Sequence, residues 1–258
     1  MRSKVAHWLT KKDVFAHNWR SISPLRKAVA VDRDFIQRIE QFIPPGFWIL
    51  LGEEYEEDYP GAVAHCMARF DEPEAHDLIG DERRARTETS FKRTVEKFAH
   101  KGMRVIPQRN NSGSHNHQEA RVGPIVLTQS FADSPEALIQ HAGFRNTLAR
   151  SRNISWLDPD PVVEEAVDEL LYGIVLHGAR RVGFRQRRYD EFGFLSIAIP
   201  NADCTKYLDV INLAERYANS EVDPNDIAAM MERGVPIERQ RRPNSVFEQY
   251  RRRASDES

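Results

Sequence analysis

Four side chains able to take part in chemistry recur at every second position between residues 115 and 121. They are His115, His117, Glu119 and Arg121. A strand over this segment would place all four on one face. Imidazole and carboxylate groups are ligands for zinc, iron or manganese. The row is therefore a candidate metal site, formed by His115, His117 and Glu119.

The same row also carries the groups for proton transfer without a metal. In this interpretation His117 is the general base, His115 is the general acid, and Glu119 shares the acid/base work. Arg121 then holds a phosphate, and Arg109 could assist it. Such a site suits metal-independent cleavage of RNA, in which the 2′-hydroxyl is the nucleophile. A third interpretation is an exposed strand whose polar face performs no chemistry.

Motifs of several common enzyme classes are absent. No lysine follows an acidic residue by two positions, as it does in many metal-dependent nuclease cores. The chain also has no Gly-Lys-Ser/Thr phosphate loop, no G-x-G-x-x-G, no G-x-S-x-G and no H-E-x-x-H. These absences argue against common ATPases, dehydrogenases, α/β-hydrolases and metalloproteases.

The length and cysteine content indicate a soluble, cytoplasmic protein. A chain of 258 residues can bury a core without disulfides or structural metals. We expect one globular domain over 1–258, with a candidate boundary near 153–161 and a disordered tail at 254–258. The two cysteines, Cys66 and Cys204, form no paired motif and are expected to be free thiols. No apolar run reaches the roughly 20 residues that span a bilayer.

Charge is strongly segregated along the chain, although its net value is only −2. Residues 53–82 hold eleven acids and one base, whereas residues 83–121 hold ten bases and three acids, a local charge of +7. Arginine outnumbers lysine 29 to 8, and the arginine fork matches phosphate geometry. A genome rich in G and C would also give this excess. The clustering nevertheless favours a partner that carries phosphates.

Two segments supply the candidate nucleic-acid-binding arginines. They are Arg104, Arg109, Arg181, Arg185, Arg187 and Arg188. Tyr189, Phe184 or Phe192 could stack on bases beside them. The alternative is a sheet edge whose charges prevent edge-to-edge pairing. A third cluster, near the C-terminus, could contact nucleic acid or an acidic partner.

Hydrophobic periodicity and turn residues predict interspersed helices and strands. Helices are expected at 24–42, 81–101, 162–177, 204–219, 224–233 and 243–253, with another starting at Ser134-Pro135. Strands are expected at 48–51, 62–70, 103–106 and 125–128, with a hairpin over 182–200. This pattern predicts an α+β fold, with a mixed or antiparallel sheet and several packed helices. At the start of the helix expected over 204–219, Cys204 would favour the thiolate.

These observations favour a nucleic-acid-binding protein, with RNA cleavage by the row at 115–121 as the sharper hypothesis. One alternative is an adaptor subunit that assembles with protein partners, or with itself, through its opposite charge patches. Another is a metal-dependent enzyme that acts on a small molecule. No cofactor is expected, apart from a divalent metal if His115, His117 and Glu119 form a metal site. No membrane association is expected.

Overall fold

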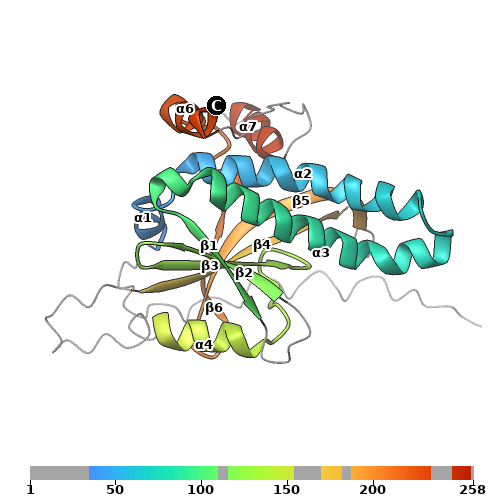
Figure 1. Cartoon of the computed structure of the whole chain (residues 1–258), viewed down its shortest axis with the longest axis horizontal. Helices are drawn as coiled ribbons and strands as arrows, with labels where there is room; N and C mark the ends of the chain where they lie inside the picture. Colours follow the sequence, from blue (N-terminus) through green and yellow to red (C-terminus); the bar gives the residue numbers. More distant parts are fainter. Residues whose placement is uncertain (1–34, 110–115, 154–169, 182–186, 234–245, 257–258) are drawn as a thin grey trace, which may run out of the picture. The chain divides into compact units, whose positions relative to one another are not determined.

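The computed structural model describes residues 35–109, 116–153, 170–181, 187–233 and 246–256 (Figure 1). One sheet has its strands in sequence order: β1 (Arg104–Arg109), β2 (Asn116–Val122), β3 (Ile125–Phe131), β4 (Leu171–Arg181), β5 (Arg187–Pro200) and β6 (Tyr207–Asn212). β3 and β4 are parallel, and all other neighbouring pairs are antiparallel. With the helices around this sheet, the α+β prediction is confirmed, and the sheet is mixed.

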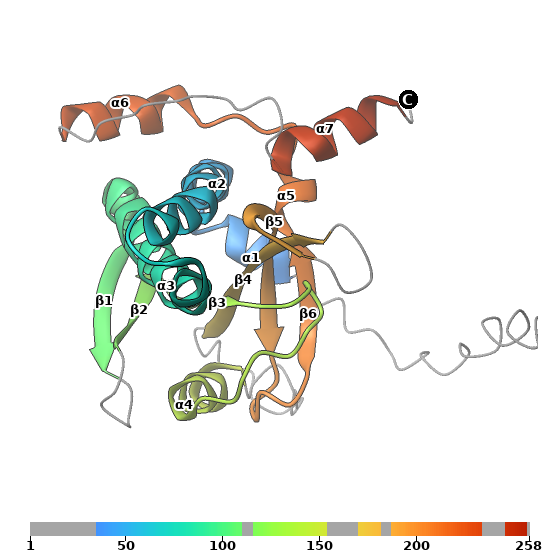
Figure 2. The same ribbon diagram turned by 90° about the vertical axis from the view of Figure 1, so that its right-hand side faces the viewer.

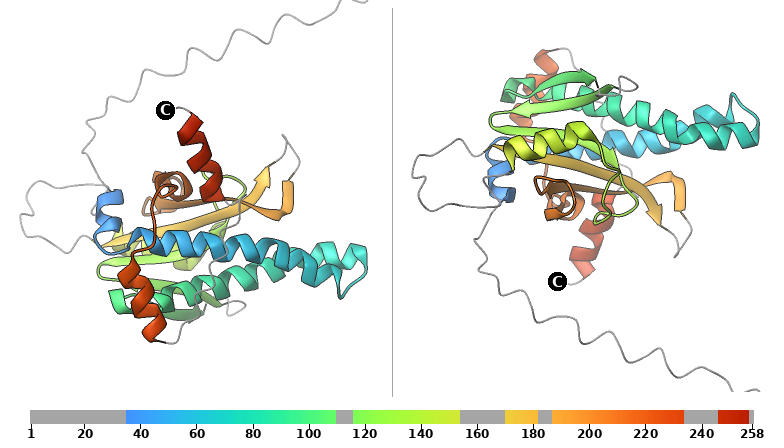
Figure 3. Two further views of the ribbon diagram at one scale, coloured as in Figure 1. Left: turned by 90° about the horizontal axis from the view of Figure 1, so that it is seen from above. Right: turned by 90° about the horizontal axis from the view of Figure 1, so that it is seen from below.

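Helices lie on both faces of the sheet (Figure 2). The described helices are α1 (Phe35–Glu40), α2 (Pro45–Met67), α3 (Glu72–Lys97), the 3-10 turn η1 (Ala99–Lys101), α4 (Gly143–Arg152), α5 (Leu213–Arg216), α6 (Pro224–Glu232) and α7 (Val246–Asp256). α2 and α3 form a long antiparallel pair over one face, and α4 lies on the other (Figures 1 and 2). The joined ends of α2 and α3 extend beyond the sheet (Figure 3). Among the described helices, none is both long and apolar enough to cross a bilayer.

α2 corrects two predictions, because a single helix replaces the strand expected at 48–51 and most of the strand expected at 62–70. Its buried side chains include Phe47, Leu51, Tyr55 and Tyr59, which recur every four residues. Such a row marks a helix face that packs on a sheet. Each short apolar run, taken alone, is compatible with a buried strand or a buried helix.

Three further predictions were wrong within the described residues. Residues 171–177 belong to strand β4 instead of a helix, and residues 207–212 form strand β6. No helix begins at Ser134, since α4 starts only at Gly143. β4 is buried along most of its length between β3 and β5, so its apolar residues show no alternation that would distinguish strand from helix. Of the helix expected at 24–42, residues 35–40 are helical and 24–34 lie outside the described residues.

Several other elements are confirmed. The helix expected at 81–101 lies in α3 and η1, which ends at Gly102 with a φ of 81°. The strands at 103–106 and 125–128 correspond to β1 and β3, and α6 and α7 match the last two expected helices. The hairpin expected over 182–200 is wrong in its bounds, because residues 187–200 form the single strand β5, which pairs antiparallel with β4. Residues 182–186 lie outside the described residues. α7 continues to Asp256, into the segment expected to be a disordered tail.

The segregated charges meet between α2 and α3. Glu54 of α2 accepts from both Arg93 (2.5 Å) and Lys97 (2.6 Å) of α3. Most of the remaining bases between Arg83 and Arg121 also have an acidic partner, in the pairs Arg84–Asp81, Arg86–Glu82, Lys92–Glu96, Lys101–Asp226 and Arg121–Glu119. The basic segment is therefore largely neutralised by acids of the same chain.

A buried amide joins α4 to the centre of the sheet. Asn153 follows α4 directly and is fully buried. Its Nδ2 donates to the carbonyl oxygens of Tyr172 (3.0 Å) in β4 and Pro200 (2.8 Å) in β5, and its Oδ1 accepts from the Tyr172 N–H (2.8 Å). One side chain thus satisfies three backbone groups on two strands.

Asp58 should make stability fall as the pH rises from about 4 to about 6. Burial in α2 raises the pKa of this carboxyl to about 6. Its Oδ2 has no hydrogen-bond partner among the described residues. Between these values the unfolded chain releases the proton before the folded chain does, so the folded state loses up to about 3 kcal/mol. We expect Asp58→Asn to raise the free energy of unfolding by about 2 kcal/mol at pH 8 and to have little effect at pH 4.

Urea denaturation at both pH values would check this expectation. The matched control is Asp77→Asn, at an exposed acid of α3. An equal effect of Asp58→Asn at pH 4 and pH 8 would contradict the assignment of the titration to Asp58.

Candidate functional site

A pocket opens where β2 and β3 diverge. These strands pair only through Ala120–Leu127, Arg121–Val126 and Val122–Ile125. Residues 116–119 of β2 and 128–131 of β3 are not paired with each other. The pocket at this end of the two strands has a volume of about 940 Å³. It also lies at the carboxyl ends of the parallel strands β3 and β4, the usual position of ligand sites in parallel sheets.

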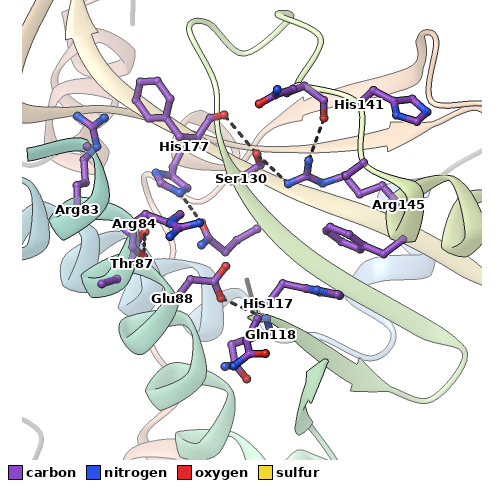
Figure 4. Close-up of a pocket in the computed structure, with 18 of the residues that line it drawn as sticks. Arg83, Arg84, Thr87, Glu88, His117, Gln118, Ser130, His141, Arg145 and His177 are labelled. Carbon is purple, nitrogen blue, oxygen red and sulfur yellow. Dashed lines mark hydrogen bonds between the residues drawn. The ribbon is translucent and has the colours of Figure 1, made fainter. Parts of the chain in front are cut away.

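The described walls of the pocket are rich in basic groups. α3 contributes Arg83, Arg84 and Glu88, and the segment that enters α4 contributes His141 and Arg145 (Figure 4). The strands contribute polar and aromatic side chains, which are His117 and Gln118 from β2, Gln129, Ser130 and Phe131 from β3, and His177 from β4. Glu88 is the one acid among these described lining residues.

Arg83 is a buried arginine that has no acidic partner among the described residues. Its relative exposure is 7%, and its Nη1 has no hydrogen-bond partner in the described part of the chain. Aromatic rings surround the guanidinium, whose Cζ lies 4.3 Å from the ring centre of Phe131, 5.2 Å from that of Tyr59 and 5.7 Å from that of Tyr189. Cation–π contacts supply about 0.5–2 kcal/mol each, whereas a buried charge without a counter-ion costs several. Arg83 is therefore suited to bind an anion.

The start of α4 adds further positive potential. Ala142 precedes the helix and offers no side-chain cap, and both Ala142 and Gly143 line the pocket. The first N–H groups of a helix attract anions. Arg145 is held beside them, since its Nη1 donates to the carbonyl of Gln140 (3.1 Å) and its Nη2 to Oγ of Ser130 (3.1 Å).

A chain of hydrogen bonds runs from the core to Glu88. Burial, together with the nearby Arg83, lowers the pKa of His177 to about 3, so this imidazole is neutral. His177 Nε2 lies 2.5 Å from Oε1 of Gln129, which can only accept. Nδ1 must then accept from the Tyr59 hydroxyl at 2.8 Å. The Gln129 amide group is thereby left to donate to Glu88.

Glu88 is held by two donors. Its carboxylate takes the hydrogen bond from Gln129, and its Oε2 accepts from the backbone N–H of Gln118 at 3.3 Å. Burial raises the pKa of Glu88, and these two hydrogen bonds offset part of that rise. The result is an oriented carboxylate that lines the same pocket as Arg83, Arg84 and Arg145.

The described part of the predicted row does lie on one face of β2. His117 Nε2 is 3.5 Å from Oε1 of Glu119, and Arg121 Nη2 is 2.7 Å from Oε2 of the same carboxylate. His117 and Glu119 are both buried. The His117 ring stacks on Phe144 of α4 at 3.7 Å, and burial lowers its pKa.

Only part of this row reaches the pocket. His117 lines it, whereas Glu119 and Arg121 are not among its lining residues. His115 lies outside the described residues. Across the described ranges, no three His, Cys, Asp or Glu side chains are placed to hold a metal ion.

The described candidate nucleic-acid-binding arginines are spread over the three strands β1, β4 and β5. Arg104 and Arg109 are exposed on β1, and Arg109 is the register partner of Asn116, which lines the pocket. Arg188 is exposed on β5, where it pairs with Asp190 and Glu191. Arg181 and Arg187 are register partners of each other across the hairpin, and Arg185 lies outside the described residues.

Cys204 does not lie at a helix start. It has a φ of 53° in the turn before β6. Burial raises the pKa of its thiol, which corrects the expectation of a favoured thiolate. Cys66 and Cys204 are both free, as the sequence predicts.

Sequence reasoning missed Arg83, Glu88, Gln129 and Arg145 as site residues. One signal for Arg83 was present, because Ala75, Ile79, Arg83, Thr87, Phe91 and Val95 follow one another at four-residue intervals and are all buried. An arginine on the buried stripe of an amphipathic helix is uncommon unless its charge is compensated. Gln129 and Arg145 carry no comparable pattern, since only the fold brings them to Glu88 and Ser130.

Comparison with models of protein families, with curated proteins and with solved structures finds no match for this chain.

Proposed function

We propose that the protein binds single-stranded RNA and holds one of its phosphates in the pocket between β2 and β3. The observation that carries this proposal is Arg83, a buried guanidinium on the pocket wall without an acidic partner among the described residues. A phosphate there would supply the missing counter-charge. An arginine fork makes paired, charge-assisted hydrogen bonds with phosphate oxygens.

Two neighbouring features support a phosphate as the anion. Arg145 is already oriented by Ser130 and Gln140, so little conformational entropy would be lost when it binds. Ala142 and Gly143, at the N-terminus of α4, line the same pocket, and the N-terminus of a helix attracts anions. A charged pocket of this kind would bind a carboxylate more weakly, because a carboxylate has fewer acceptor oxygens and a smaller charge.

Tyr189 favours a nucleic acid over a small phosphorylated molecule. Its ring is half exposed and lies 5.7 Å from the guanidinium of Arg83. A nucleotide whose phosphate meets Arg83 could stack its base on this ring, and such stacking contributes about 1–3 kcal/mol per base. Arg180 and Arg188 lie beside Tyr189 in exposed ion pairs with acids of β5. Exposed pairs of this kind are weak, so a phosphate could compete for them.

Arg145→Gln should weaken RNA binding by about 10-fold at low salt and reduce the slope of log K against log [salt] by about 0.7. The matched control is Arg150→Gln on the same helix, because Arg150 is exposed, pairs with Asp203 and is not a lining residue. Fluorescence anisotropy with labelled single-stranded RNA over a salt series would measure both quantities. Equal affinities for the wild type and Arg145→Gln would exclude the pocket as the phosphate site. A protein that does not bind RNA at low salt, but changes its size in solution with salt, would support the adaptor alternative instead.

A further inference from the structure

Glu88 is the only acid in the described part of the pocket wall. Three arginines and three histidines line the same space. A carboxylate placed among groups that bind phosphate would repel the ligand unless it had a separate task. Its position therefore points to chemistry on the bound phosphate or on a group next to it.

The hydrogen bonds of Glu88 fix its orientation and its role. The tautomer of His177 determines that Gln129 accepts from the histidine and donates to Glu88. Gln118 donates a backbone N–H to Oε2. Both partners donate, so Glu88 is held as a proton acceptor. A carboxylate needs this form to act as a general base.

Resting on the RNA binding proposed above, we infer that Glu88 is the general base of an RNA-cleaving reaction in this pocket. Glu88 takes the proton of a 2′-hydroxyl, and the 2′ oxygen attacks the adjacent phosphorus. The bond between phosphorus and the 5′ oxygen breaks. The departing oxygen takes a proton from a water molecule, and the hydroxide left behind recovers the proton from Glu88. The products are a 2′,3′-cyclic phosphate and a 5′-hydroxyl end, with no net change in protons.

The other groups of the pocket suit this reaction. Negative charge grows on the phosphate oxygens during the attack, and Arg83 and Arg145 lie on the wall where that charge would be stabilised. The nucleophile belongs to the substrate, so binding alone brings it next to phosphorus. Burial raises the pKa of Glu88, which makes it a stronger base than an exposed glutamate.

Cleavage of end-labelled single-stranded RNA in the presence of EDTA tests this inference. DNA and 2′-O-methyl RNA of the same sequence serve as substrates that lack the nucleophile. We expect the wild type to cleave only RNA and to leave 2′,3′-cyclic phosphate ends. Glu88→Gln should lower the rate constant at saturating RNA by about 10²- to 10⁴-fold, with the Kd for RNA unchanged within about threefold.

The controls separate this inference from the binding proposal. Glu96→Gln, at an exposed acid of α3 paired with Lys92, should cleave as the wild type does. Glu88→Asp keeps the charge but withdraws the carboxylate by one methylene, and should retain partial activity. If Glu88→Gln does not fold, Glu88→Asp and the wild-type product ends still decide the question.

RNA binding without cleavage would overturn the inference and leave the binding proposal intact, whereas no RNA binding would overturn both. Cleavage of DNA or of 2′-O-methyl RNA, or dependence on a metal ion, would also overturn the assignment of Glu88.

Discussion

Arg83→Met is expected to weaken binding of single-stranded RNA by about 30- to 100-fold while raising the free energy of unfolding by about 1 kcal/mol. These effects have opposite signs because one group causes both. The guanidinium is desolvated among Phe131, Tyr59 and Tyr189, with no acidic partner among the described residues. A methionine of similar length would keep the contacts with these rings and remove the buried charge. It would also remove the group that a phosphate needs.

Anisotropy and urea denaturation on the same preparation would measure both effects. Arg86→Met is the matched control, since Arg86 lies three residues away on α3 and pairs with Glu82 at 2.7 Å. It should change RNA affinity little. A large loss of stability in Arg83→Met with unchanged binding would show that Arg83 serves the packing of α3 and has no ligand.

Asn153→Ala is expected to lower the free energy of unfolding by about 4 kcal/mol, the largest effect on stability predicted for this chain. The substitution leaves the N–H and C=O of Tyr172 and the C=O of Pro200 without their side-chain partner in a fully buried position. Each buried polar group left without a partner costs about 1–3 kcal/mol. Asn153→Asp should also be destabilising, because its second oxygen would face two carbonyl oxygens.

Thermal and urea denaturation would measure this loss, with Asn225→Ala at an exposed position of α6 as the control. A loss below about 1 kcal/mol would mean that water replaces the amide without penalty. The substitution should destabilise α4 and the β4–β5 pair together, because the Asn153 side chain joins them.

The sequence predicts α3 from residue 81 onwards because its pattern is local. α3 carries charged side chains on one side and a buried stripe on the other. The hairpin expected over 182–200 is not predicted correctly, because residues 187–200 form the single strand β5. The same reasoning fails for α2 and β4. Their apolar runs are buried by partners distant in sequence, and burial on several sides removes the periodicity that separates helix from strand.

Charge was misleading for a related reason. Counting bases between Arg83 and Arg121 gives an excess, but it does not reveal that Glu54 lies against Arg93 and Lys97. Ion pairs of this kind neutralise most of these bases, and Arg83 is a buried base without an acidic partner among the described residues. The row at 115–121 can be recognised in the sequence because its spacing is regular. Glu88 and Arg145 come from separate helices, and no spacing in the sequence relates them.

The short pairing between β2 and β3 has a mechanical consequence. β1 and β2 are joined along six residue pairs, yet β2 is joined to β3 by only three, all at one end. The β1–β2 hairpin is thus attached to β3 by a short ladder. The opposite end of the hairpin can move without breaking any residue pair of that ladder. At that end the N–H of Gln118 donates to Glu88 of α3, and His117 stacks on Phe144 of α4. A substrate that engages the Glu88 carboxylate would therefore also weaken its hydrogen bond with Gln118. The separation of β2 from β3 and the proton transfer would then depend on the same side chain.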